Sequence, residues 1–139
     1  MGRAETFEHT ADLGLRVTGR DLPDLFEAAA GLYDVIVANR EDVRATETES
    51  IHLAADDLPD LLLGWINELI FRSETQHRLY SRFEVRIDEG TPSLDATIAG
   101  EPIDRDRHVL DHEVKAATHH GLMVRPVDDG WLAEVILDI

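Results

Sequence analysis

The sequence contains no cysteine, and its only lysine is Lys115. Without cysteine the chain has no disulfide, no zinc–thiolate site and no thiol nucleophile, so a reducing cytoplasm is a compatible location. The 13 basic residues stand against 29 acidic ones, which leaves a formal net charge of −16. Such a charge argues against an extended nucleic-acid-binding surface, because binding of that kind begins with the neutralisation of phosphates.

Long apolar runs are also missing, and no segment reaches the length of a membrane-spanning helix. The first five residues carry charge instead of the apolar core of a secretory signal. The sequence therefore predicts a cytoplasmic protein with no membrane association. Its acidic, lysine-poor composition resembles that of proteins from high-salt cytoplasm, where screening weakens the repulsion between like charges.

The length of 139 residues fits a single domain, residues 1–139, because no linker or low-complexity segment divides it. The pentapeptide DLPDL occurs at residues 21–25 and again at 57–61, each time before apolar residues at helical spacing. An Asp before the first turn accepts hydrogen bonds from free N–H groups, and proline is tolerated at that position. We therefore expect two helices, at about residues 22–37 and 58–74.

The remaining apolar residues alternate with polar ones, which is the pattern of half-buried strands. We expect strands near residues 13–17, 51–55, 83–87, 94–98, 114–118, 122–126 and 131–139. Turn-forming residues at 89–92 and 128–130 join neighbouring strands as hairpins. Hairpins interrupted by two helices predict an α+β fold, in which the two helices pack on a largely antiparallel or mixed β-sheet.

Two carboxylates at opposite ends of the sequence give the most specific indication of chemistry. Asp12 precedes the first expected strand, and Asp138 lies beside Ile139 and its main-chain carboxylate. If the first and last strands pair, these three sources of oxygen meet, and hard divalent cations select such oxygens. The alternatives are local: Asp12 could bond the N–H groups of a turn, and Asp138 could belong to a frayed terminus.

A second candidate group lies at residues 113–121, EVKAATHHG. Lys115 could supply a point charge to phosphate or orient a carboxylate, and the alternative is a salt bridge with one of the many acids. His119 and His120 could bind a transition metal, although adjacent histidines on a strand point apart and rarely share an ion. The sequence has no phosphate-binding glycine loop, nucleophile elbow or helical zinc-binding pair, so independent catalysis is not expected.

Taken in order, these segments resemble the archease family. The similar segments are FEHTADLG at residues 7–14, LLLGWINEL at 61–69, EVKAATHHGL at 113–122 and the end from 131 to 139. The resemblance implies a small protein cofactor, not an enzyme, for the GTP-dependent RNA ligase that joins tRNA halves in splicing. It implies promotion of ligase guanylylation and of multiple turnover, with GTP used by the ligase and tRNA met only through the ligase.

The resemblance also implies which residues act. Asp12, Asp138 and the carboxylate of Ile139 are expected to hold a divalent metal ion, which is calcium in crystals, with magnesium or manganese as alternatives. Lys115 aligns with a family lysine and joins Asp12 and Asp138 as a candidate for ligase activation.

Three histidines complete these expectations. His9 and His120 are candidates for supporting the metal ligands or the fold. His119 departs from the family pattern, in which tyrosine is usual at this position. Two other functions stay open: a stand-alone metal-dependent hydrolase of phosphate esters, and a chaperone-like interaction module.

Overall fold

The computed structural model describes residues 2–9 and 12–139, without the side chains of Glu8 and His9. The strands are β1 (Arg3–His9), β2 (Asp12–Gly19), β3 (Glu47–Ala54), β4 (Arg78–Asp88), β5 (Ser93–Pro102), β6 (Ala116–Val127) and β7 (Gly130–Asp138). The helices are α1 (Leu22–Ala29), α2 (Tyr33–Ile36) and α3 (Leu58–Gln76), with short 3₁₀ turns η1 (Ala30–Leu32) and η2 (Arg40–Asp42). None of the helices in these ranges is both long and apolar enough to cross a bilayer.

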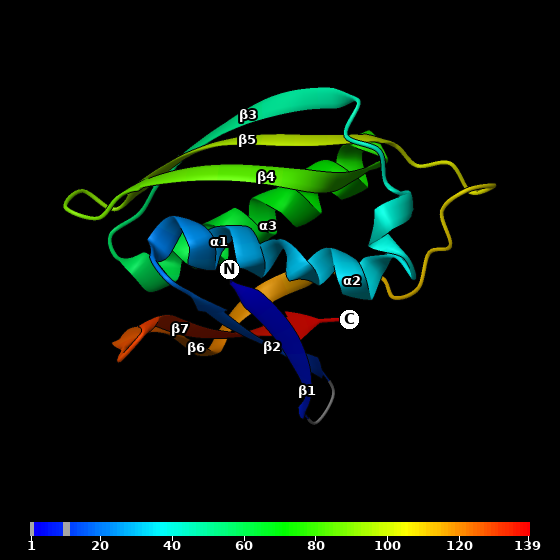
Figure 1. The fold of residues 1–139 in the computed structure, drawn as a ribbon. Helices are drawn as coiled ribbons and strands as arrows, with labels where there is room; N and C mark the ends of the chain where they lie inside the picture. The colour runs from blue at the N-terminus through cyan, green and yellow to red at the C-terminus, as the bar shows by residue number, and fades with distance from the viewer. Residues whose placement is uncertain (1, 10–11) are drawn as a thin grey trace.

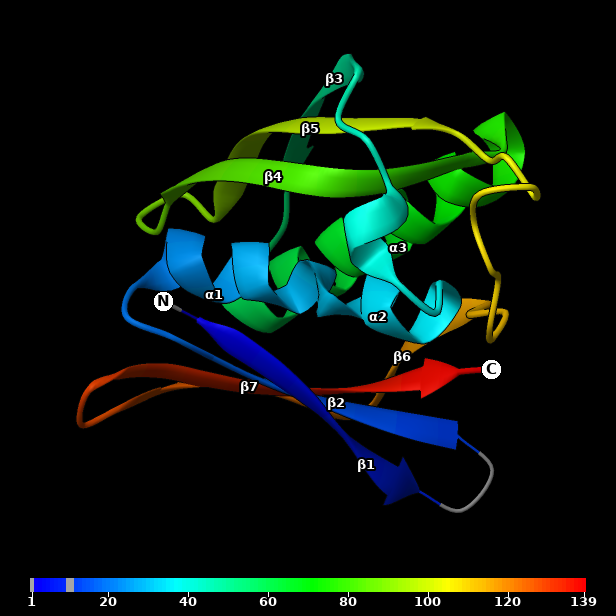
Figure 2. The ribbon, with the colours of Figure 1, turned by 45° about the vertical axis from the view of Figure 1, so that its right-hand side comes forward.

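The strands form two antiparallel sheets, one with the order β1-β2-β7-β6 and the other with the order β3-β5-β4. The helices lie between the two sheets, so that the molecule has three layers (Figure 1; Figure 2). This arrangement confirms the α+β class, with its strands divided between two sheets where the sequence analysis expected one. The reason is the wide apolar face of α3, which both sheets can cover. Its buried residues are Leu61, Leu62, Leu63, Trp65, Ile66, Leu69 and Ile70.

Both expected helix starts are present. Asp21 accepts a hydrogen bond from the Asp24 N–H at 2.9 Å, and Asp57 accepts one from the Asp60 N–H at the same distance. The first expected helix is divided into α1, η1 and α2, and its end at Val37 is extended backbone with φ −124° and ψ 138°. The second runs two residues beyond the expected end and closes at His77 in the left-handed conformation.

β1 is the one strand that the sequence analysis did not predict. Its apolar residues Ala4 and Phe7 are three positions apart and therefore fall on opposite faces, so the two-residue alternation of a half-buried strand is absent. Only pairing with β2 reveals it: Phe7 lies opposite Gly14, and His9 lies opposite Asp12. β1 forms one edge of the four-stranded sheet.

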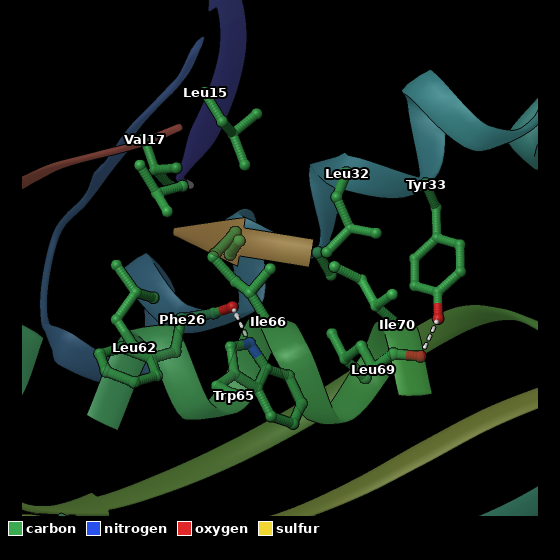
Figure 3. Close-up of a cluster of buried hydrophobic side chains, with 14 of the residues drawn as sticks. Leu15, Val17, Phe26, Leu32, Tyr33, Leu62, Trp65, Ile66, Leu69 and Ile70 are labelled. Atoms are coloured by element: carbon green, nitrogen blue, oxygen red, sulfur yellow. Dashed lines mark hydrogen bonds between the residues drawn. The ribbon is translucent and has the colours of Figure 1, made fainter. Parts of the chain in front are cut away.

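The core between the layers contains large side chains with polar tips that are hydrogen-bonded (Figure 3). The Trp65 indole N–H donates to the main-chain oxygen of Phe26 at 2.8 Å, and the Tyr33 hydroxyl donates to that of Leu69 at 3.3 Å. Burial of each such side chain contributes about 1.5–3 kcal/mol, and the paired polar atoms avoid a desolvation penalty. These contacts connect α1 and α2 to α3 within the helical layer between the two sheets.

Candidate functional site

The pairing of β2 with β7 brings the two predicted carboxylates to the same end of one sheet. Leu13 lies opposite Leu137 in this antiparallel pair. β2 begins at Asp12 and β7 ends at Asp138, so each carboxylate is the next residue beyond that pair. Successive side chains on a strand alternate between faces, so both Asp side chains lie on the face opposite the two leucines. Both are half-buried, and the expected meeting of the first and last predicted strands is confirmed.

The same end of the sheet includes the neighbouring strands. His9 on β1 lies opposite Asp12, although its side chain is outside the described residues. Asp138 lies opposite Ala116, and the Lys115 N–H donates to the main-chain oxygen of Asp138 at 2.7 Å. The Lys115 side chain is exposed. The Lys115 backbone therefore lies beside Asp138, and its cationic side chain extends from there into solvent.

The structure corrects the start of the strand predicted at residues 114–118. β6 begins only at Ala116, so Lys115 precedes the strand. Lys115 is exposed whereas Ala117 is buried, because the residues before β6 follow the connecting segment and not the strand alternation.

Asn67 on α3 holds this end of β6 in place. Its side-chain oxygen accepts a hydrogen bond from the Ala117 N–H at 2.8 Å, and its side-chain nitrogen donates to the Ala117 carbonyl oxygen at 3.2 Å. β6 is an edge strand, so these two backbone groups have no strand partner on that side. Sequence reasoning did not select Asn67. The available signal was an amide within a largely apolar helix.

A buried charge cluster fixes the connecting segment that leads to Lys115. Glu101 and His108 are 6% and 2% exposed. The Asp104 N–H donates to His108 Nδ1 at 2.9 Å, so Nδ1 is the acceptor and Nε2 carries the proton toward Glu101, 2.9 Å away. Glu101 also accepts bonds from Arg107 and from the Arg44 N–H. His108 thus connects the main chain of Asp104 to the Glu101 carboxylate.

The pKa of Glu101 reflects these contacts. Burial by itself raises the pKa of this carboxyl, because the charged form loses water. The hydrogen bonds from Arg107, the Arg44 N–H and His108, together with the Arg107 charge, outweigh burial and lower the pKa to about 2. Glu101 therefore stays ionised at any ordinary pH and anchors the start of the segment.

The far half of this segment is tied to α2 by main-chain bonds. The Ala38 N–H donates to the Val109 oxygen at 2.8 Å, and the Asp111 N–H donates to the Ile36 oxygen at 2.7 Å. Val37 and Leu110 form an isolated antiparallel bridge between the same two stretches. The backbone of Lys115 is thus positioned from one side by this segment and from the other by β7.

Side chains on the outer face of the four-stranded sheet pack against the part of β2 that follows Asp12. A Cβ atom on Gly14 would overlap the Phe7 ring, so only glycine lets that ring lie across β2. The Arg16 guanidinium lies 4.7 Å from the centre of the same ring and pairs with Glu134 on β7 at 2.6 Å. This row fixes the position of β2 relative to β1 and β7.

The two adjacent histidines lie elsewhere. The register of β6 against β7 shifts between Thr118 and Met123, and His119 and His120 fall in this irregular stretch, with Gly121 at φ +68°. Both side chains are exposed, and His119 Nε2 lies 3.4 Å from Asp60 at the start of α3. His120 therefore lies farther along β6 than Ala116, the residue opposite Asp138.

The donor set at the sheet end fits a hard cation. It consists of two half-buried carboxylates and the exposed end of the chain at Ile139, which is 38% exposed, and all of these offer oxygen. Within residues 2–7 and 12–139, no three His, Asp or Glu side chains lie close enough to hold an ion by themselves.

The model of the Archease protein family matches residues 5–139. The chain is 37% identical to an archease from Pyrococcus abyssi over 143 residues, with 100% of both chains covered. It is 39% identical to an archease from Methanopyrus kandleri over 140 residues, which covers 97% of this chain and 98% of that one.

Two solved structures are similar. One is the solution structure of a protein from Methanobacterium thermoautotrophicum, with a TM-score of 0.84, 36% identity and 98% of each chain covered. The other is the crystal structure of an archease from Thermotoga maritima, described as a possible chaperone. It has a TM-score of 0.64 and 20% identity, covers 97% of this chain and 96% of that one, and shows the fold alone.

Proposed function

The chain belongs to the archease family, and we propose that it is a protein cofactor that activates a GTP-dependent tRNA-splicing RNA ligase. In this proposal it promotes guanylylation of the ligase and repeated turnover in the cytoplasm. The observation that carries the proposal is the pairing of Leu13 with Leu137, which sets Asp12 and Asp138 at one end of a sheet beside the Lys115 backbone.

Asp12, Asp138 and the carboxylate of Ile139 are the groups that would hold a calcium, magnesium or manganese ion. A bound divalent ion would supply positive charge for phosphate oxygens of GTP at the mouth of the ligase active site. Lys115 offers a second, movable positive charge from the same end of the sheet. Orientation and charge placement of this kind would lower the activation barrier of ligase guanylylation, and this chain would need no nucleophile of its own.

The net charge of the chain supports the choice of partner. An RNA ligase has to hold a polyanion, and surfaces that do so are basic. A protein with a net charge of −16 is attracted to such a surface and repelled by the RNA itself. In this proposal the RNA therefore remains the ligand of the ligase, and the cofactor meets tRNA only through it.

The test is a guanylylation assay with purified ligase and GTP at high salt. Wild-type protein should accelerate covalent attachment of GMP to the ligase, whereas Asp12→Asn and Asp138→Asn should lose most of that acceleration. Asp128→Asn, on the exposed turn between β6 and β7, is the matched control and should behave as wild type. Equal rates with wild type and with both site variants would contradict the proposal.

Two other functions make different predictions for these variants and in separate assays. A chaperone-like module, the description attached to the similar Thermotoga maritima structure, should suppress aggregation of unrelated unfolded proteins and tolerate Asp12→Asn. A metal-dependent hydrolase should turn over a phosphate ester with no ligase present. Ligase stimulation that depends on Asp12 and Asp138 distinguishes the proposed role from both.

A further inference from the structure

One face of α3 carries two features that no contact among the described residues explains. Gly64 lies in the middle of this helix, is exposed, and a Cβ atom built on it meets no atom of the described residues within 4 Å. Phe71, seven positions later, is 60% exposed. Residues spaced by three or four positions share one helix face, and Asp60, Gly64, Asn67 and Phe71 form such a row.

Both features are unfavourable for the isolated chain. Glycine inside a helix loses more backbone entropy than alanine, and here no close contact or turn requires it, in contrast to Gly14 under the Phe7 ring. An exposed phenylalanine leaves a large apolar surface in water. Both costs are offset if another protein lies against α3, because glycine allows close approach and Phe71 is then buried.

This face is continuous with the candidate site. Asn67, in the same row, holds Ala117 through two hydrogen bonds, and the neighbouring Ala116 lies opposite Asp138. At its other end α3 shares a hollow of about 360 Å³ with the residues that precede Lys115. Its lining includes Ile70 and Glu74 from α3, and Glu113 and Val114 from the connecting segment. A partner protein bound to α3 would therefore also lie close to the end of the sheet that carries Asp138.

The charges around this row of residues indicate the charge of the partner that fits it. Asp60 and Glu74 are exposed on or beside it. The adjoining hollow is lined by the acids Asp111 and Glu113, by Arg105, and by Arg78, which is already paired with Glu47 at 3.0 Å. The nearby Arg72 is already paired with Glu68 at 2.7 Å and with Glu49 at 2.9 Å. Such a surface repels RNA, and it also repels a second copy of a chain with a net charge of −16.

We propose that the face of α3 formed by Asp60, Gly64, Asn67 and Phe71 is the docking surface for a basic protein surface with an apolar recess that receives Phe71. This inference rests on the proposed function, in which the partner is the RNA ligase and the docking surface is a basic flank beside its RNA channel. Gly64 sets the close approach, Phe71 supplies the apolar anchor, and the acidic rim directs the encounter.

The test measures the affinity of purified chain for purified ligase by calorimetry. Phe71→Ser and Gly64→Gln should each raise the dissociation constant at least tenfold. Gly64→Gln is informative because glutamine favours helix more than glycine does, so weaker binding cannot result from a weaker helix. Val109→Ser and Val127→Ser remove exposed apolar side chains outside α3 and should change the constant less than twofold. Affinity should also fall as salt rises.

The guanylylation assay separates this inference from the proposed function. At saturating concentration the two α3 variants should stimulate the ligase as wild type does, whereas Asp138→Asn should bind normally and fail to stimulate. If both α3 variants bind like wild type while wild type stimulates the ligase, the docking inference is wrong and the proposed function stands. If wild type neither binds nor stimulates, both are wrong. A wild-type dimer that Phe71→Ser converts to monomer would identify a second copy as the occupant and overturn the inference.

Discussion

Leu13 on β2 lies directly opposite Leu137 on β7, and this one pair joins the beginning and the end of the sequence. It places Asp12 and Asp138 one step beyond, on the same face of the sheet. The Lys115 N–H then bonds the main chain of Asp138. Asp12 and Asp138 are far apart in the sequence, so the candidate site depends entirely on the register of β2 and β7.

Asn67→Ala should destabilise the chain by about 1–3 kcal/mol, because it leaves both backbone groups of Ala117 without their partner at a sheet edge. Urea unfolding followed by tryptophan fluorescence measures the change. Asn39→Ala is the control, since Asn39 accepts one exposed bond from the Glu41 N–H, and its loss should cost less. Equal stabilities for the two variants would show that the Asn67 contacts contribute little.

Two glycine-to-alanine changes should have opposite signs. Gly14→Ala drives a methyl group into the Phe7 ring and should destabilise by about 1–3 kcal/mol. Gly64→Ala enters open space in the middle of α3 and should stabilise by about 0.5–1 kcal/mol. Thermal unfolding of both variants beside wild type checks the pair. Loss of stability in Gly64→Ala would contradict the open surroundings of that residue.

Glu101 should make a stabilising contribution that depends on pH. Its folded pKa is about 2 against an ordinary value of 4.5, so the unfolded chain takes up the proton first as pH falls. The contribution, up to about 3 kcal/mol, is therefore complete above pH 4.5 and is lost between there and pH 2. The difference in unfolding free energy between wild type and Glu101→Gln, measured from pH 6 to about pH 2, should shrink across that window. A difference independent of pH would refute the assignment.

Calcium should raise the thermal stability of wild type without being required for folding, because the core is formed by the helices and sheets and not by the candidate ligands. At about 100 times the dissociation constant the gain is about 2.7 kcal/mol. Asp138→Asn, and a chain extended beyond Ile139, should lose this gain, while matched sodium chloride should not reproduce it. The same calcium-dependent rise in all three chains would rule out the sheet-end site.

Local patterns predicted much of this fold. The repeated DLPDL segments predicted both helix starts, because an Asp that accepts a first-turn N–H acts within three residues of itself. The apolar alternation before and after the helices predicted β2 and β7, and the pairing of these two strands was the condition on which the shared carboxylate site depended. β1 escaped prediction because Ala4 and Phe7 do not alternate, and the role of Asn67 escaped because an amide in a helix gives no indication of the edge strand it will meet.

The sequence by itself determined the class of elements, their approximate limits and the acidic, cysteine-free character of the surface. These properties depend on side-chain chemistry and on spacing within a few residues. Only the tertiary structure decided that the strands divide into two sheets around the helices, that Asn67 closes the edge of β6, and that Asp12 faces the same side as Asp138. Those outcomes depend on which apolar surfaces pack against one another. That packing is made by residues far apart in the chain, so short sequence patterns do not determine it.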